Sequence, residues 1–323
     1  FLHVCGIPYD RYALAEALAR AERYAGIEGG GMDQAVSLLA RDGHALRIDF
    51  FPLRARPVPF PAGVHIVVCD SLVEAAKTGG ARRAYNTRVV ECKLAAVLIA
   101  REYERKTGLA ASVERIADLD ALFASCGERV REACVGAALD GDVLPLGEIA
   151  LRLGMSPECV LQTYCRTRGG ETVAPPPMGF AVGPRYRHVV SEAARVEEAE
   201  QALGRGDAQR FGELMNASHE SCREAYEVSC GELERLVACA REAGALGARL
   251  TGAGFGGCTV NLVASENMES FLRAMRGMYR RERAEVLEER GVAADDAVFV
   301  CHPVAGASVV AGCGDDAGRT GNS

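Results

Sequence analysis

The chain has 323 residues, of which 49% are hydrophobic and 25% charged, a composition typical of a globular protein and not of a disordered one. Its net charge is −7 and no basic stripe is present, so we expect neither nucleic acid nor an anionic membrane as a partner. No apolar run approaches the roughly 18–20 residues that a membrane span needs.

Thirteen cysteines are spread singly along the chain, and none forms a Cys-x-x-Cys pair. The sequence therefore suggests neither a zinc ribbon nor a thioredoxin-type redox site. Cys92, Cys134 and Cys239 lie in apolar helical patterns, so we expect buried, reduced thiols in a cytoplasmic protein. The chain begins at Phe1 without a signal-peptide pattern, and we expect its true N-terminus to lie upstream.

The hydrophobic pattern predicts helices and strands in mixed order, which is an α+β class of fold. In chain order, helices are expected over 11–25, 83–104, 186–204, 208–226, 231–243 and 265–284, and residues 114–165 are expected to be all-helical. Strands are expected over 44–50, 64–71, 248–254 (running into a glycine loop), 258–263 and 297–304. Loops are expected over 78–83 and 169–184, a turn at the end of 58–61, and a disordered tail over 308–323.

The glycine stretch TGAGFGGCTV (251–260) matches the spacing of a dinucleotide-binding fingerprint. That fingerprint requires a helix after the glycines, because the helix N-terminus holds the pyrophosphate. Here the β-branched stretch CTVNLV follows, so we reject a Rossmann site. Two interpretations remain: a loop whose backbone passes close to a phosphate or another segment, or simply a tight hairpin.

Four stretches occur together in one order: AERYAGIEGGGMDQA (21–35), YNTRVVECKLAA (85–96), GELMNASHESCREAYEVSCGEL (212–233) and GALGARLTGAGFGGCTVNLV (244–263). In this order and wording the chain resembles galactokinases, most closely the eukaryotic branch that includes N-acetylgalactosamine kinases. These belong to the GHMP group of small-molecule kinases, and the resemblance runs from about residue 12 to residue 307.

The resemblance implies two α+β domains with the sugar and ATP meeting between them. Residues 1–62 would be the last part of an N-terminal domain of the ribosomal protein S5 domain 2-like type. Residues 63–307 would form a ferredoxin-like domain with added helices. ATP and Mg²⁺ are the implied cofactors, and we expect a monomer.

Asp33 matches the catalytic aspartate of the family's Met-Asp-Gln motif, which takes the proton of the anomeric hydroxyl as the hydroxyl attacks phosphorus. A positioned base is commonly worth roughly 10²–10⁴ in rate. From spacing alone, Asp33 could instead be a helix N-cap. Gly30 matches a glycine whose backbone contacts the sugar. Tyr85 matches a tyrosine that hydrogen-bonds it, although a core aromatic at the start of a helix is the alternative.

In the glycine loop, the resemblance implies close backbone approach near the nucleotide by Thr251, Gly252, Gly254, Gly256 and Gly257. Other polar residues of the motifs receive structural interpretations. Arg88 and Glu91 are expected to form an intrahelical pair, and His219 is expected to be a structural histidine. Asp70 stands where relatives carry a small polar residue, and either faces solvent or repels phosphate.

The resemblance also implies a sugar motif and a serine-rich phosphate loop upstream of residue 1. We therefore expect the 323-residue chain alone to be inactive. Three functions remain open for the parent protein: a galactokinase, an N-acetylgalactosamine kinase, and a non-catalytic sensor that binds galactose and ATP. The Gly29–Gly31 run favours the second and Tyr85 favours the first.

Overall fold

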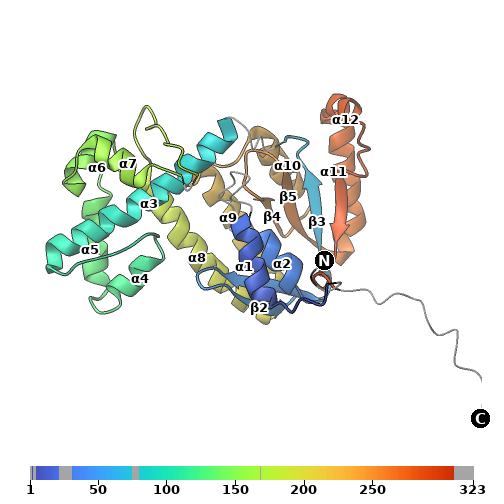
Figure 1. Cartoon of the computed structure of the whole chain (residues 1–323). Coiled ribbons are helices and arrows are strands. Elements are labelled where there is room, and N and C mark those ends of the chain that lie inside the picture. Colours follow the sequence, from blue (N-terminus) through green and yellow to red (C-terminus); the bar gives the residue numbers. More distant parts are fainter. Residues whose placement is uncertain (1, 3–4, 22–30, 75–79, 168, 309–323) are drawn as a thin grey trace, which may run out of the picture.

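The computed structural model describes residues 2, 5–21, 31–74, 80–167 and 169–308. The described part contains a four-stranded sheet, a two-stranded hairpin and many helices, as the α+β expectation requires (Figure 1). The expected helix end at 22–25 and the tail at 309–323 lie outside the described residues.

The four-stranded sheet has the order β4-β5-β3-β6, with all neighbours antiparallel. Its strands are β3 (Val64–Asp70), β4 (Gly247–Thr251), β5 (Cys258–Ala264) and β6 (Val298–Cys301). Helices separate β3 from β4 and β5 from β6, while β4 and β5 are joined directly. This is the β-α-β-β-α-β arrangement of a ferredoxin-like unit, and it confirms that expectation.

One face of this sheet is packed against α10 (Gly231–Glu242) and α11 (Met268–Glu282). Alternate strand residues such as Val67 and Val263 are fully buried there together with Phe271 of α11. The alternation of buried residues follows from the period of two along a strand. The short helix α12 (Ala284–Arg290) follows α11.

A second core lies among helices at some distance from the sheet. The long helices α3 (Gly80–Thr107) and α8 (Val182–Gly204) run between this region and the sheet (Figure 1). Around them gather α4 (Asp118–Phe123), α5 (Glu128–Ala138), α6 (Leu146–Leu153) and α7 (Pro157–Tyr164). Leu94 and Ile99 of α3 are completely buried in this core. The helix α9 (Ala208–Glu224) follows α8 and returns to the sheet.

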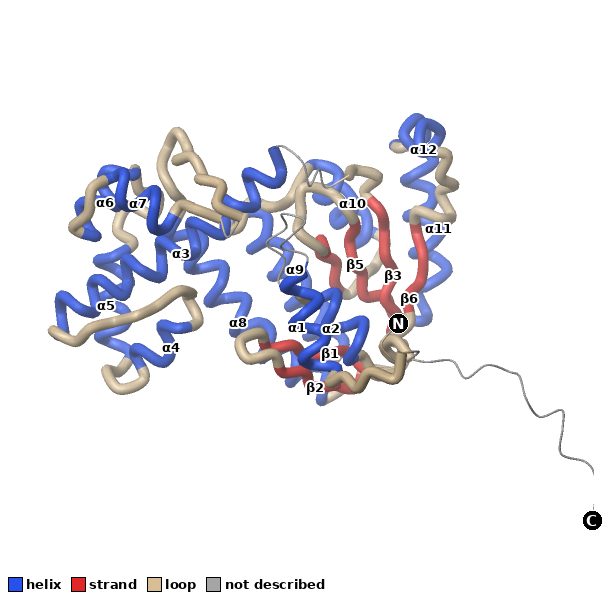
Figure 2. The backbone as a smooth tube through the Cα atoms, viewed as in Figure 1, coloured by secondary structure: helices blue, strands red, loops and turns tan. Residues whose placement is uncertain are grey.

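The N-terminal part consists of α1 (Arg11–Ala21), α2 (Met32–Leu39) and a hairpin of β1 (His44–Asp49) and β2 (Arg54–Pro59). Figure 2 shows this hairpin as a strand pair separate from the four-stranded sheet. Arg47 of β1 forms an ion pair with Glu200 of α8, which ties the hairpin to the long helix. A domain boundary near residue 62 stays a prediction.

Several predicted boundaries need correction. Strand β2 was not expected, because only a turn was predicted near 58–61. Helix α3 begins at Gly80, inside the loop predicted over 78–83, and α8 begins at Val182, inside the loop predicted over 169–184. The predicted helix over 265–284 is a short 3-10 turn followed by α11, and α12 was missed.

Most of the described cysteines are buried or half-buried, as expected, but Cys5 and Cys159 are exposed. Every described cysteine is free, and Cys134 and Cys239 are buried while Cys92 is half-buried. Burial raises the pKa of the Cys69 thiol to about 12, so this group stays protonated and unreactive at neutral pH. Within the described residues, no helix is long and apolar enough to cross a membrane.

Candidate functional site

The glycine stretch forms the connection of an antiparallel hairpin. Thr251 of β4 pairs with Cys258 of β5, so residues 252–257 form the glycine loop between them. A strand follows the glycines, which confirms the rejection of the dinucleotide fingerprint. Gly252, Gly254, Gly256 and Gly257 all have positive φ angles, between 78° and 138°. Glycine adopts such angles without steric cost, and this is one reason for the composition of the loop.

The glycine loop packs closely against other parts of the chain. The Phe255 amide donates to the Val228 carbonyl at 2.7 Å, and a Cβ at Gly254 would lie 2.1 Å from the same oxygen. On the other side, the Gly257 carbonyl accepts from the Ser71 amide at 2.8 Å. At Gly252, by contrast, a Cβ would meet nothing within 4 Å. The backbone at Gly254 therefore packs against Val228 of the same chain, whereas Gly252 faces open space.

A cavity of about 740 Å³ brings the start of α2 and the start of the glycine loop together. Met32, Thr251 and Gly252 line it. The rest of its wall comes from the β1–β2 hairpin, α8, α9 and the open face of the sheet, and its charged residues are Arg47, Glu192, Arg195, Glu200 and Arg249. Asp33, Tyr85, Gly254, Gly256 and Gly257 are not among its lining residues.

Asp33 is the second residue of α2, next to the cavity-lining Met32. The N-cap of this helix is Gly31, and no side chain caps it, so the interpretation of Asp33 as the N-cap is wrong. Its carboxylate is exposed and makes no hydrogen bond or ion pair with any described residue. An aspartate in the first turn is favoured by the positive end of the helix dipole.

Packing explains why Gly31, the last residue of the glycine run before Asp33, is a glycine. Gly31 is buried with φ 84°, and a Cβ there would lie 2.7 Å from the Cβ of Ala19 in α1. A side chain at this position would push the two helices apart. Gly30, predicted to contact the sugar, lies outside the described residues.

Tyr85 is half-buried in the second turn of α3, and it stays a predicted sugar ligand. On the same helix, Arg88 and Glu91 form the expected intrahelical pair, with 3.5 Å between Nη1 and Oε2. Arg88 also donates through Nε to the carbonyl of Tyr226 at 2.8 Å. The pair is thus part of a larger network, which sequence spacing alone could not indicate.

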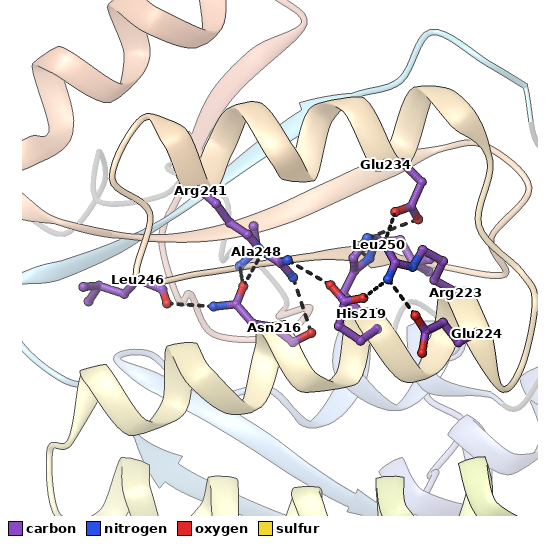
Figure 3. Close-up of polar contacts among 10 residues, drawn as sticks. Asn216, His219, Arg223, Glu224, Glu234, Arg241, Leu246, Ala248 and Leu250 are labelled. Atoms are coloured by element: carbon purple, nitrogen blue, oxygen red, sulfur yellow. Dashed lines mark hydrogen bonds and ion pairs between the residues drawn. The ribbon is translucent and has the colours of Figure 1, made fainter.

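The third motif forms a close contact between α9 and the edge strand β4. Gly212 of α9 and Gly247 of β4 meet with no room for side chains, since a Cβ on Gly247 would lie 2.4 Å from the Gly212 carbonyl oxygen. This approach lets Asn216 reach the strand backbone. Its Oδ1 accepts from the Ala248 amide at 2.9 Å, and its Nδ2 donates to the Leu246 carbonyl at 3.2 Å (Figure 3).

His219 continues the same contact and has the structural role that was predicted. It is 1% exposed, and its Nδ1 accepts from the Leu250 amide at 3.3 Å. Its Nε2 lies 3.2 Å from Oε1 of Glu234 in α10 (Figure 3). Burial lowers the pKa of His219, and the nearby Glu234 only partly opposes this. The neutral imidazole, with Nδ1 free to accept, is the form that fits.

Asp70 ends β3 by shaping a turn. Its Oδ1 accepts from the Leu72 amide at 2.9 Å, and its carbonyl accepts from the hydroxyl of Tyr279. A carboxylate is well suited to this local turn, because Asp side chains readily hydrogen-bond the backbone two residues on. This hydrogen bond explains why an aspartate stands at position 70. Neither of the two expected alternatives, exposure to solvent or repulsion of phosphate, included such a turn.

Sequence reasoning missed the charged wall of the cavity and the support beneath the glycine loop. Arg195 and Arg249 line the cavity, and Val228 supports the loop. No local signal identifies them, because their partners lie far away along the chain.

In comparisons with known proteins, the chain is similar to GHMP kinases and to galactokinases. The family model described as GHMP kinases C terminal matches residues 199–281. The chain is 34% identical over 322 residues to the galactokinase of Dictyostelium discoideum, covering 93% of this chain and 63% of that protein. It is 31% identical over 320 residues to the galactokinase of Saccharomyces cerevisiae, covering 88% of this chain and 60% of that protein. The chain thus spans about three-fifths of the length of these two relatives.

Among solved structures, the chain resembles the crystal structure of Lactococcus lactis galactokinase complexed with galactose. The TM-score is 0.63 at 24% identity, and the match covers 94% of this chain and 62% of that chain. At this level of identity the likeness establishes the fold alone. The chain therefore has the GHMP kinase fold.

Proposed function

We propose that the protein containing this chain is an ATP-dependent sugar kinase of the galactokinase type, which converts galactose and ATP to galactose 1-phosphate and ADP. The observation that carries the proposal is the exposed Asp33 carboxylate, which has no partner among the described residues and directly follows Met32, a residue that lines a cavity together with Thr251 and Gly252. The 34% identity to a galactokinase over 93% of the chain supports the same chemistry.

In this reaction Asp33 is the base. It takes the proton of the anomeric hydroxyl while that oxygen forms a bond to the γ-phosphorus, and the bond from phosphorus to the departing ADP oxygen breaks. Phosphoryl transfer of this kind depends mostly on positioning and on neutralising charge.

The remaining roles follow from the motifs. Gly30 and Tyr85 contact the sugar, and Thr251, Gly252, Gly254, Gly256 and Gly257 shape the nucleotide side. Gly252 has the open space for close approach to a ligand, whereas Gly254 acts by letting the loop settle on Val228. We further propose a monomer in the cytoplasm, with a boundary near residue 62 between an N-terminal and a C-terminal domain.

Magnesium would enter as the ion carried by ATP. Mg²⁺ is commonly bound through one or two carboxylates together with substrate phosphates. The described residues contain no group of three or more His, Cys, Asp or Glu that could hold a metal ion, so we assign no ligand set to this chain.

An assay of the whole protein with two sugars tests the proposal. ADP release is measured with galactose and with N-acetylgalactosamine in the presence of ATP and Mg²⁺, and we expect the higher kcat/KM for galactose. A higher value for N-acetylgalactosamine would keep the chemistry and correct the substrate. Galactose binding in calorimetry without turnover would replace the kinase by a sensor.

A further inference from the structure

A buried ion pair lies outside the site assigned above. Arg185 of α8 and Glu91 of α3 are each 1% exposed, and Nε of Arg185 donates to Oε2 of Glu91 at 2.6 Å. The other oxygen of Glu91 accepts from the Ala181 amide at 2.9 Å. Burial by itself lowers the pKa of Arg185, but the charges of Glu91 and Glu227 outweigh it and raise the pKa above its ordinary value.

Such a pair is a poor way to gain stability. Removing two charges from water carries a large desolvation cost, and apolar residues of similar volume often give equal or greater stability. The value of the pair then lies in the geometry that a planar guanidinium fixes through its several donors. The groups that Arg185 holds in place are therefore informative.

Arg185 and its neighbour Arg88 hold residues 225–228, the segment that follows α9. Nη1 of Arg185 donates to the Ala225 carbonyl at 2.6 Å, and Nη2 donates to Oε2 of Glu227 at 2.5 Å. Arg88 donates through Nε to the Tyr226 carbonyl at 2.8 Å and through Nη2 to the Glu227 carbonyl at 3.2 Å. Glu227 is held in a left-handed conformation with φ 53°.

The 225–228 segment in turn supports the glycine loop. Val228 at its end accepts the Phe255 amide, and its carbonyl occupies the space where a side chain on Gly254 would be. A shift of this segment would therefore move the loop directly. Arg88 lies one turn after Tyr85 on α3. The same helix therefore carries the predicted sugar contact and one of the two arginines that hold the 225–228 segment.

We propose that Arg185 is a positioning residue for the nucleotide: through the 225–228 segment it sets the position of the glycine loop. The inference rests on the proposed assignment of this loop to the nucleotide side. Arg185 does not line the 740 Å³ cavity and acts only through Ala225, Glu227 and Val228.

The test compares Arg185→Lys with wild type in the whole protein. Lysine keeps the charge beside Glu91, but a single ammonium cannot also hold Ala225 and Glu227 in the fork geometry. We expect the KM for ATP and the Kd for a fluorescent ADP analogue to rise about ten- to hundredfold, the range that a misplacement of order 1 Å can produce. The KM for galactose should stay within about twofold of wild type, a split that general loss of structure would not give.

The matched control is Arg187→Lys, two residues further along α8. Arg187 is exposed and forms an ion pair with Asp142 at 2.6 Å, away from the glycine loop, so ATP kinetics should not change. If Arg185→Lys does not fold, Glu227→Gln takes its place, because that side chain is 56% exposed and its loss leaves the buried Glu91 paired. We expect the same direction of change in nucleotide binding, by several-fold.

The outcomes separate the two proposals. Unchanged analogue binding in folded Arg185→Lys, or in Glu227→Gln if that variant has to be used, overturns the positioning role. Absence of analogue binding by wild type overturns it as well. If wild type binds the analogue but phosphorylates no sugar, and the variant binds more weakly, the proposed kinase function fails while the positioning role stands.

Discussion

At the scale of single residues, the glycines of the motifs have separate causes. Gly31 combines a positive φ with a close approach to Ala19, and Gly254 combines one with a close approach to Val228. Gly252 has a positive φ and free space. A sequence shows only that glycine is present, whereas the neighbour that requires it comes from another part of the chain.

Gly31→Ala should destabilise the protein more than Gly63→Ala. Both glycines have a φ near 80°, which costs a residue with a side chain about 1–2 kcal/mol. Only at Gly31 would the added Cβ also overlap another helix, and such overpacking costs about 1–3 kcal/mol more. Urea unfolding of both variants measures the difference. Equal losses would show that α1 yields to the added methyl group without cost.

At the scale of elements, α9 protects the free edge of the sheet. Asn216 and His219 satisfy the strand backbone at alternate positions along β4, which otherwise would present unpaired amides. Arg241 of α10 completes this contact by donating to Oδ1 of Asn216 at 2.9 Å. The motif that contains these two residues thus fixes the strand that leads into the glycine loop.

Stability should fall as pH decreases from 7 to 5, partly because of His219. Its folded-state pKa lies below the ordinary value, so its contribution is complete above the unfolded-state pKa of about 6.5 and is lost as pH falls towards the folded-state value. One such group gives a slope of at most about 1.4 kcal/mol per pH unit. His188 adds to the slope, because burial lowers its pKa too.

His219→Gln separates the two histidines. The glutamine oxygen can still accept the Leu250 amide but does not titrate, so the pH slope of the unfolding free energy should become shallower. His302→Gln, at an exposed position, is the comparison variant measured over the same pH range. An unaltered slope in His219→Gln would contradict a neutral His219 in the folded protein.

The elements also show what the sequence could and could not predict. Alternation identified β1 and a buried apolar run identified β3, whereas β2 was missed because the prolines of residues 58–61 favoured a turn. Prolines at 57 and 59 are tolerated in β2, because among the described strands it pairs only with β1 and so needs fewer backbone donors. Gly80 suggested a loop, but α3 already begins there, and an ion pair between Arg82 and Glu171 holds its first turn.

The candidate site was predictable to a similar extent. The motifs located Asp33 and the glycine loop, because both are marked by local composition. They could not locate the Glu91–Arg185 pair, whose members are 94 residues apart, or the contact of Gly254 with Val228. Those partners are selected by the packing of α3, α8 and α9, which no short pattern encodes.

At the scale of the whole molecule, several separate packing contacts position the start of α2 and the glycine loop. The α1–α2 contact at Gly31 presents Asp33, and the α9–β4 contact leads into Thr251. The 225–228 segment supports the glycine loop, and the cavity joins Met32 to Thr251 and Gly252. The proposed kinase function requires such an arrangement, because the proposed base and the proposed phosphate-side loop must keep a fixed relation during transfer.

The measurement that tests the account most directly is the kcat of Asp33→Asn for galactose phosphorylation in the whole protein. Asparagine keeps the shape of the side chain but cannot take the proton, so we predict a fall of about 10²–10⁴-fold with galactose binding retained. Asp42→Asn, an exposed aspartate in the turn before β1, should keep wild-type turnover. A kcat for Asp33→Asn within a few-fold of wild type would contradict the assignment of Asp33 as the base.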